Sequence, residues 1–280
     1  MKGLPDLAIP ALLRKYNLTA KKGLGQNFLL DAAALEKIVT AAEIPPQASV
    51  LEIGPGLGSL TRYLARAARQ VVAVELDASL IPALQEVLVG EKNVTIVHGD
   101  ILKQDIGALI SDPGYLVVAN IPYYITSAVI RHLLEAQVKP SRLVLTMQKE
   151  VAARICAKPG DLSMLALGVQ VYGEPRAVAH IPAGAFYPPP KVDSTVLRVD
   201  LYPQSKISAD LMNDFFHLAK VAYAQKRKTL RNTLSAGLHW PPEKVLKILT
   251  SAGIDPMRRA ETVRLDEWEI LVQAYRSAGK

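Results

Sequence analysis

Four short segments of the chain carry residues that can bind a polar ligand. They are the glycine-rich run L51-E-I-G-P-G-L-G-S59, the acids Glu75 and Asp100, and the run N120-I-P-Y-Y-I-T126. Glycines let a backbone pass close to a ligand, and the N-terminus of a following helix favours a negative group. Carboxylates at such positions can accept from ribose hydroxyls or an adenine amine, so these segments predict a nucleotide-like ligand.

The glycine spacing separates two classes of cofactor. Proteins that bind NAD carry G-x-G-x-x-G. Here Gly54, Gly56 and Gly58 form G-x-G-x-G, and Ser59 stands where the third glycine of that fingerprint should be. The spacing therefore favours S-adenosylmethionine over NAD. On this motif alone, a tight turn without a ligand stays an alternative.

Strand-like and helix-like runs alternate around these segments. Strands are predicted over 49–53, 70–75, 93–97, 115–119 and 142–146, and helices over 32–42, 60–68, 79–89, 127–135 and 149–157. This alternation predicts a parallel, doubly wound sheet of the α/β class. Ligands of such sheets bind outside the carboxyl ends of the strands. We therefore expect Gly54, Glu75, Asp100 and Asn120 to share one crevice.

The pattern changes after residue 160. Strands are expected over 169–172 and 194–202 at the sheet edge, and the run F186-Y-P-P-P-K-V-D-S194 is expected to be extended. Helices are expected over 212–224, 230–236, 243–252 and 266–275. These patterns predict an α/β domain over residues 1–204 and a small C-terminal all-α domain over residues 205–280.

The composition is that of a folded, basic protein. Half of the 280 residues are apolar, 21% are charged, and the formal net charge of +7 favours an anionic partner such as nucleic acid. The single cysteine, Cys156, excludes an internal disulfide. No apolar run approaches the ~20 residues that span a bilayer, and no secretory signal is visible. A cytoplasmic protein without a membrane partner is expected.

Seven motifs, in order along the chain, carry a family resemblance. They are G25-Q-N-F-L-L30, L51-E-I-G-P-G-L-G58, V74-E-L-D77, G99-D-I-L102, N120-I-P-Y123, M147-Q-K-E-V151 and F186-Y-P-P-P-K-V-D-S194. From about residue 22 to about residue 265, the chain resembles the ribosomal RNA small-subunit adenine dimethyltransferases. The resemblance implies a Rossmann-like methyltransferase domain that uses S-adenosylmethionine. It also implies the substrate, two adjacent adenosines in a hairpin near the 3′ end of 16S rRNA, within the 30S subunit or its precursor. A monomer is expected.

The N-I-P-Y run resembles the motif of methyltransferases that modify exocyclic amines. An adenine amine is a poor nucleophile, because its lone pair is delocalised into the ring, so the enzyme must supply alignment. The Asn120 side chain and the Ile121 carbonyl can each accept one N–H, Pro122 fixes the turn, and Tyr123 can stack on a flipped base. No titrating base is needed. Tyr124 is expected to pack in the protein.

The resemblance also implies the other residues around the cofactor and the base. Asn27 and Leu29 are expected over the cofactor, with Gln26 at its methionine end. The remaining cofactor-binding residues are expected to be Gly54, Gly56, Glu75, Leu76, Asp100, Ile101 and Asn120. The ring of Phe186 is expected to close the other face of the target base. The alternative is that Phe186 and Tyr187 pack the proline-rich loop.

Basic residues cluster in two places. Phosphate contacts are expected at Lys21, Lys22, Lys220, Lys226, Arg227, Lys228 and Arg231. The alternative is a solvated face, but the net charge and the implied RNA substrate favour phosphate contact, which would make methylation depend on salt. The histidines show no metal-binding spacing, so no protein-bound metal is expected.

Three other functions stay open. Methylation of large-subunit rRNA uses the same chemistry, although F-Y-P-P-P-K-V-D-S and K-R-K-T-L-R-N resemble the small-subunit family more. A non-catalytic RNA-binding or assembly factor could have kept the fold, but Glu75, Asp100 and the N-I-P-Y run argue against loss of catalysis. An NAD-dependent oxidoreductase is disfavoured by the glycine spacing and by the lack of a proton-transfer residue at Asn120.

Overall fold

The computed structural model describes residues 4–279, which form two compact units. The first unit comprises the residues up to Ala152 together with Pro175–Leu201. The second comprises Ala153–Glu174 together with the residues from Tyr202 onward. The expected boundary after residue 204 lies close to the one at Tyr202. The 153–174 segment, however, joins the C-terminal helices, because the N–H groups of Gly160 and Leu162 donate to the Glu261 carbonyl at 2.8 and 3.3 Å.

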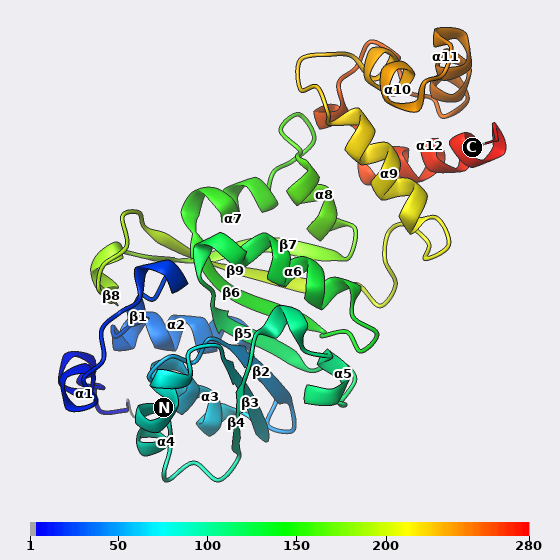
Figure 1. The fold of residues 1–280 in the computed structure, drawn as a ribbon. Helices are drawn as coiled ribbons and strands as arrows, with labels where there is room; N and C mark the ends of the chain where they lie inside the picture. Colours follow the sequence, from blue (N-terminus) through cyan, green and yellow to red (C-terminus); the bar gives the residue numbers. More distant parts are fainter. Residues whose placement is uncertain (1–3, 280) are drawn as a thin grey trace. The chain divides into compact units, whose positions relative to one another are not determined.

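Seven strands form one sheet in the order β4-β3-β2-β5-β6-β9-β7 (Figure 1). Their bounds are β2 Ser49–Ile53, β3 Gln70–Glu75, β4 Val94–His98, β5 Leu116–Asn120, β6 Arg142–Gln148, β7 Gly173–Ile181 and β9 Ser194–Leu201. Strands β4, β3, β2, β5 and β6 are parallel, and β9 runs antiparallel to β6. The predicted doubly wound α/β sheet is therefore confirmed, including its antiparallel edge.

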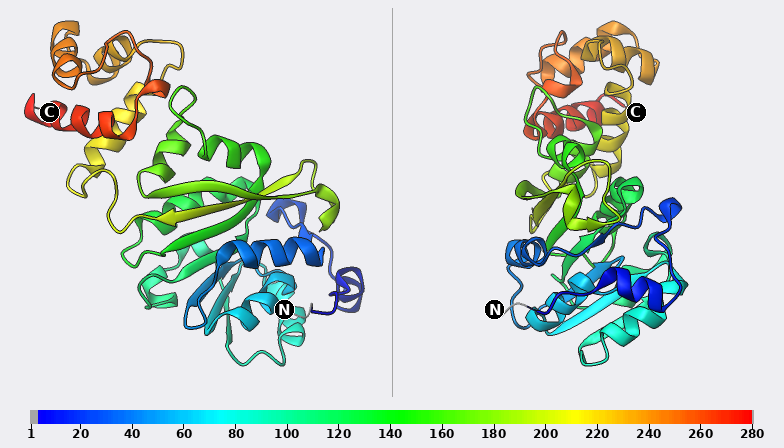
Figure 2. Two further views of the ribbon diagram at one scale, coloured as in Figure 1. Left: turned by 180° about the vertical axis from the view of Figure 1, so that it is seen from behind. Right: turned by 90° about the vertical axis from the view of Figure 1, so that its left-hand side faces the viewer.

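Helices cover the sheet on both faces. Helices α2 (Ala32–Ala42) and α3 (Ser59–Ala67) bury apolar side chains against β2, β5 and β6, while α6 (Thr126–Glu135) lies on the opposite face in both ribbon views (Figures 1 and 2). The remaining helices of this part of the chain are α4 Ile81–Val87, α5 Ile106–Leu109 and α7 Lys149–Ile155. None of the helices within residues 4–279 is long and apolar enough to cross a membrane.

Short elements outside the main sheet were not predicted. Helix α1 (Ile9–Lys15) precedes a two-residue strand, β1 (Phe28–Leu29), which pairs antiparallel with β8 (Phe186–Tyr187). In this ladder Phe28 lies opposite Tyr187 and Leu29 lies opposite Phe186. The pairing brings the Q-N-F-L-L and F-Y-P-P-P motifs side by side, although they are far apart in the sequence. Single 3-10 turns are η1 Lys22–Leu24, η2 Ala78–Leu80, η3 Ile101–Lys103, η4 Tyr123–Ile125, η5 Ala183–Ala185 and η6 Ala260–Thr262.

The second unit is helical. Its helices are α8 Met164–Gln170, α9 Met212–Ala222, α10 Leu230–Leu238, α11 Pro242–Ser251 and α12 Leu265–Ser277. The four C-terminal helices agree with the sequence pattern. The strand expected over 169–172 is wrong, because Val169 and Gln170 end α8, and β7 begins only at Gly173. Ser163 is the N-cap of α8, because its Oγ accepts from the Ala166 N–H at 3.2 Å. The apolar run V169-Q-V-Y172 was taken for a strand, and this helix start was therefore missed.

Candidate functional site

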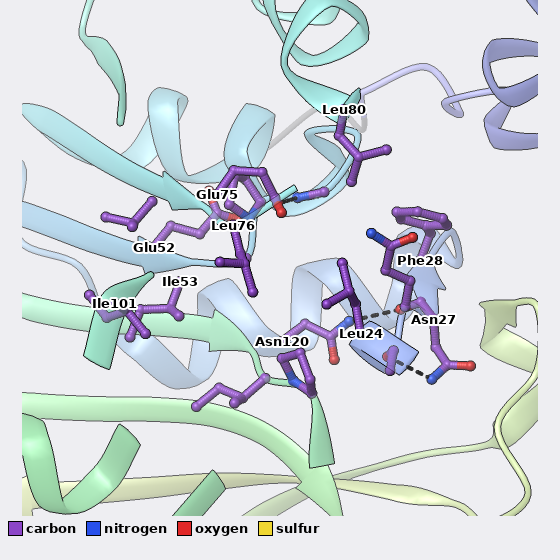
Figure 3. A pocket seen from close by; sticks show the side chains of 18 of the residues that line it. Leu24, Asn27, Phe28, Glu52, Ile53, Glu75, Leu76, Leu80, Ile101 and Asn120 are labelled. Atoms are coloured by element: carbon purple, nitrogen blue, oxygen red, sulfur yellow. Dashed lines mark hydrogen bonds between the residues drawn. The ribbon is translucent and has the colours of Figure 1, made fainter. Parts of the chain in front are cut away.

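A pocket opens at the carboxyl ends of the central parallel strands (Figure 3). Gly54, Glu75, Asp100 and Asn120 all line it, as the sequence predicted for residues at neighbouring strand ends. The N-terminal segment from Leu24 to Leu29 forms the facing wall. Neither wall alone encloses the pocket, so the segment before the first sheet strand is part of the site.

The glycine-rich turn needs glycine at all three positions. Gly54, Gly56 and Gly58 have φ values of +70°, +60° and +86°, which side chains other than glycine rarely adopt. A Cβ atom added at Gly56 would also lie 3.1 Å from the ring of Phe28. Gly58 is the residue before α3, so the third glycine turns the chain into that helix. The G-x-G-x-G spacing is thus dictated by the backbone of this turn.

Glu75 ends β3 with its carboxylate in the pocket wall, 5% exposed. Its Oε2 accepts from the Gly56 N–H at 2.9 Å, and its Oε1 accepts from the Asp77 N–H at 2.8 Å. Burial raises the pKa of Glu75, and the two N–H donors oppose that shift. Because each carboxylate oxygen has a second lone pair, Glu75 can still accept from a pair of ligand hydroxyls.

Glu52 is a pocket residue that the sequence analysis missed. It lies within β2, 1% exposed, and no donor among the described residues contacts its Oε2. Burial raises its pKa to about 8, and the charge of nearby Glu75 adds to the shift. An acid within the apolar run S49-V-L-E-I53 was the signal that could have identified it, because buried carboxyl groups need a partner.

Replacing Glu52 with glutamine is expected to flatten the pH dependence of stability in the cofactor-free protein. The folded-state pKa of about 8 lies above the ordinary value of 4.5. Between these values the native protein keeps a proton that the unfolded chain has released. The free energy of unfolding should therefore fall as pH rises through this window, by up to about 1.4 kcal/mol per pH unit. Urea unfolding across the window measures the slope; an equal slope in Glu52→Gln would contradict the assignment.

Asn120 is oriented by a contact from the opposite wall. Its Nδ2 donates to the Asn27 carbonyl at 3.1 Å (Figure 3), so the amide presents Oδ1 as its remaining acceptor. The next residue, Ile121, donates its N–H to the Thr146 carbonyl at 3.3 Å, which ties the motif to the end of β6. Both residues line the pocket. The side chain of Asn120 and the backbone of Ile121 are therefore both held in place, while their roles as acceptors stay predictions.

The two tyrosines of the motif are placed differently from the expectation. Tyr123 is partly buried, and its hydroxyl lies 2.7 Å from Ser194 Oγ. Tyr124, expected to pack in the protein, is instead 60% exposed and lines the pocket. The expectation assumed an extended chain, in which neighbouring side chains point to opposite sides. Residues 123–125 form the 3-10 turn η4, where successive side chains are only about a third of a turn apart.

The Tyr123–Ser194 contact should matter for turnover. Tyr123→Phe and Ser194→Ala are each expected to lower kcat several-fold, because one hydrogen bond of about 1 kcal/mol is lost while the aromatic ring of residue 123 stays. The double variant should be no slower than the slower single variant, because both changes remove the same contact. Steady-state methylation kinetics measure this, with Tyr124→Phe as the matched control. Additive losses would mean that the two hydroxyls act separately.

Phe186 and Tyr187 alternate in the short strand β8. Phe186 is 3% exposed, packs in the core with Leu29 and Leu35, and is absent from the pocket wall, whereas Tyr187 is 41% exposed. Successive side chains of a strand point to opposite faces, so pairing with β1 turns Phe186 inward. This placement differs from the expected stacking of Phe186 on the target base and agrees with the alternative that it packs the loop. Any role of Phe186 at the base stays a prediction.

Gln26 lines the pocket, but its amide is already used. Its Nε2 donates to Asp77 Oδ2 at 2.8 Å, and its Oε1 accepts from the Lys21 N–H at 2.8 Å. Lys21 Nζ also pairs with Asp77 Oδ1 at 2.6 Å. Burial alone would raise the pKa of Asp77, but hydrogen bonds from Lys21, Ser79 and Gln26 lower it to about 2. Gln26 and Lys21 therefore fasten the N-terminal segment to the loop after β3.

The other expected cofactor residues line the same pocket. Asn27 and Leu29 belong to the N-terminal wall, and Leu76 and Ile101 give the strand-end side an apolar surface. Asp100 caps the turn η3 by accepting from the Leu102 N–H at 3.1 Å. Figure 3 shows Leu24, Asn27 and Phe28 facing the strand-end residues across the pocket. Each of these positions agrees with the expectation, while the individual ligand contacts stay predictions.

The expected RNA-binding cations differ in how they are paired. All seven side chains are exposed. Lys21 forms an ion pair with Asp77, and the other six form none with a described acid. These unpaired cations are Lys22, Lys220, Lys226, Arg227, Lys228 and Arg231. Within residues 4–279, no group of three or more His, Cys, Asp or Glu side chains could hold a metal ion.

The pocket suits S-adenosylmethionine in the chemistry of its walls. The turn at Gly54 and Gly56 leaves backbone exposed to a ligand, and Glu75 offers acceptors for ribose hydroxyls. The Oε2 of Glu52 is buried without a protein donor, and a bound ligand that carries positive charge would favour the ionised form of this acid. A nicotinamide dinucleotide would need the wider glycine spacing that Ser59 interrupts.

Comparison with known proteins gives matches over nearly the whole chain. A family model described as ribosomal RNA adenine dimethylase matches residues 17–276. A protein of Dehalococcoides mccartyi (strain CBDB1) named ribosomal RNA small subunit methyltransferase A is 47% identical over 266 residues, covering 94% of this chain and 91% of the relative. A protein of Alkaliphilus metalliredigens with the same name is 41% identical over 270 residues, covering 94% of each chain.

Two solved structures share the fold over most of their length. A dimethyladenosine transferase from Plasmodium falciparum has a TM-score of 0.79 at 26% identity, covering 90% of this chain and 98% of that one. The 23S rRNA methyltransferase ErmE has a TM-score of 0.71 at 29% identity, covering 89% and 99%. Both units of the chain therefore have counterparts in solved proteins.

Proposed function

Since the chain belongs to the ribosomal RNA adenine dimethylase family, we propose that it acts on the small ribosomal subunit. Family membership makes it an S-adenosylmethionine-dependent rRNA adenine dimethyltransferase. Its proposed targets are two adjacent adenosines in a hairpin near the 3′ end of 16S rRNA, within the 30S subunit or its precursor. Identity of 47% to a relative named for the small subunit, against 29% to one named for 23S rRNA, supports this choice.

The observation that carries the mechanism is the orientation of Asn120. With Nδ2 held by the Asn27 carbonyl, Oδ1 can accept one N–H of an adenine amine while the Ile121 carbonyl accepts the other. Two acceptors on one side draw the amine out of the plane of the base and localise its lone pair. Alignment of this kind supplies much of the catalysis when the reacting groups need no further activation.

S-adenosylmethionine supplies an activated methyl group on a sulfonium when it is bound. The chain holds it between the strand ends and the N-terminal segment: Glu75 accepts from the ribose hydroxyls, and Leu76 and Ile101 offer an apolar surface. Glu52 is a second buried acid in the wall of this pocket and, once ionised, would favour the positive charge of the sulfonium. The amine nitrogen is transiently cationic once it carries the new methyl group and can release a proton to water, so the residues from Asn120 to Thr126 need no base.

Tyr123 and Tyr124 both line the entrance beside Asn120, so either ring can contact a flipped base. We assign the platform to Tyr123, because its hydroxyl contact with Ser194 holds the ring in one position. An ordered ring loses less conformational entropy when a base stacks on it. The exposed Tyr124 then covers the cofactor side of the entrance, where it lies against Gly25.

The unpaired cations of the second unit are proposed to contact rRNA phosphates. Lys226, Arg227, Lys228 and Arg231 are exposed and close in sequence at the start of α10. Such contacts position an RNA without reading its sequence. We propose that the enzyme works as a monomer in the cytoplasm. Both walls of the pocket come from one chain, so the site needs no second copy.

The test offers the enzyme immature 30S particles and protein-free 23S rRNA, each with labelled S-adenosylmethionine. Label is expected in 16S rRNA only, and its incorporation should weaken steeply with salt. Incorporation into 23S rRNA alone would assign the chain to the large-subunit branch of the same family. That result would leave the methyltransferase chemistry intact while overturning the proposed substrate.

A further inference from the structure

A second groove lies on the first unit, next to β8. It is lined by Leu13 and Arg14 of α1, by Leu18 and Thr19, and by Tyr187 of β8, with Pro10, Ala20 and Pro188 completing it. Its free volume is about 350 Å³, at the small end of the range of ligand sites. The function derived so far does not use this groove.

The groove and the cofactor pocket share one short ladder, whose paired residues contribute a side chain to each cavity. Tyr187 is paired with Phe28, whose side chain lines the cofactor pocket close to Gly56. Residues directly opposite each other in an antiparallel pair have Cα atoms about 5 Å apart. One residue pair of this ladder therefore lines both cavities, which makes the groove the candidate site for a nucleotide next to the one in the pocket.

The groove has the chemistry that a nucleotide needs. The Tyr187 ring is exposed, whereas its neighbour Phe186 is buried, so the strand presents one aromatic face to solvent. Arg14 is exposed and forms no ion pair with a described acid, although the adjacent Lys15 is paired with Glu86. Aromatic rings bind unpaired bases by stacking, and guanidinium groups bind phosphate through paired N–H donors.

We propose that this groove holds the nucleotide next to the adenosine being methylated, with its base on Tyr187 and a phosphate at Arg14. The inference rests on the proposed function, because two adjacent adenosines must use one pocket in turn. While one adenosine occupies the pocket, the groove holds its neighbour in place. The groove thereby favours substrates in which the neighbouring base is a purine, which stacks over more area than a pyrimidine.

The first arm of the test uses the full-length enzyme on 30S particles. Tyr187→Ala is expected to lower kcat/KM for rRNA roughly tenfold or more, the range for loss of one stacked base. The affinity for S-adenosylmethionine, measured by calorimetry, should be unchanged. Tyr187→Trp should restore the rate, because it restores the aromatic face. Val192→Ala, which shortens another exposed apolar side chain of the loop before β9, is the matched control.

The second arm changes the substrate. Particles reconstituted with 16S rRNA that carries uridine beside one target adenosine should be methylated more slowly by the wild type. Tyr187→Ala should methylate these particles no more slowly than it methylates normal ones, since it already lacks the stacking contact between residue 187 and the neighbouring base. Wild-type rates in Tyr187→Ala, or equal slowing of both enzymes by uridine, would overturn the groove assignment. A wild type that does not methylate 30S particles at all would instead overturn the proposed function.

Discussion

Asn120→Ala is expected to abolish methyl transfer while S-adenosylmethionine still binds within about tenfold of its normal affinity. The substitution removes Oδ1, the proposed acceptor for the amine, together with the Nδ2 that donates to the Asn27 carbonyl. Loss of one preorganised polar group at a reacting centre commonly lowers kcat about 10²–10³-fold. Single-turnover rates on 30S particles measure the chemical step, and calorimetry measures cofactor binding.

Asn120→Asp is the informative companion. It keeps an acceptor in the same place but loses the Nδ2 donor, so a carboxylate oxygen would face the Asn27 carbonyl. We expect a rate between those of the wild type and Asn120→Ala. If Asn120→Ala kept kcat within a few-fold of the wild type, the amide would not be the catalytic acceptor.

Glu75→Gln is expected to weaken S-adenosylmethionine binding roughly 10²-fold, which corresponds to about 2.7 kcal/mol. In the native protein both carboxylate oxygens accept from N–H groups, those of Gly56 and Asp77. A glutamine amide must point its NH₂ at one of these donors, and this repulsion should distort the glycine turn that is proposed to hold the cofactor. Calorimetry measures the affinity, and thermal unfolding of the cofactor-free variant controls for loss of the fold.

The same variant separates catalysis from any role in ribosome assembly. If Glu75→Gln lost cofactor binding but 30S maturation in cells continued unchanged, assembly would not depend on methylation. Near-normal affinity in Glu75→Gln would contradict the assignment of Glu75 as a cofactor acceptor. In that case Glu52, the other buried acid of the pocket, would become the leading candidate for that role.

The sequence predicted the strand-end half of the site well. Buried apolar runs of five or six residues marked β2, β3 and β5, and polar or glycine residues at their carboxyl ends, such as Gly54, Glu75 and Asn120, marked the positions that face the pocket. Parallel strands place their carboxyl ends at one edge, so the shared pocket followed from topology alone. The apolar pattern of each segment was enough to predict these strands, because a buried strand is recognised from its own residues.

Other features depended on contacts between distant residues. The pairing of Phe28 with Tyr187 joins segments 159 positions apart through a ladder of two residues, too short for any periodic signal. That ladder decides that Phe186 is buried and Tyr187 exposed. The exposure of Tyr124 followed from the 3-10 turn η4, where the sequence reading assumed an extended chain.

Mass spectrometry of 16S rRNA, isolated from 30S particles after reaction with the purified enzyme, tests the central claim most directly. It reports the position of every added methyl group and the number at each nucleotide. We predict two methyl groups on the exocyclic amine of each of two adjacent adenosines in a hairpin near the 3′ end, and none with Asn120→Ala. Methyl groups on another nucleotide, or only in 23S rRNA, would contradict the account.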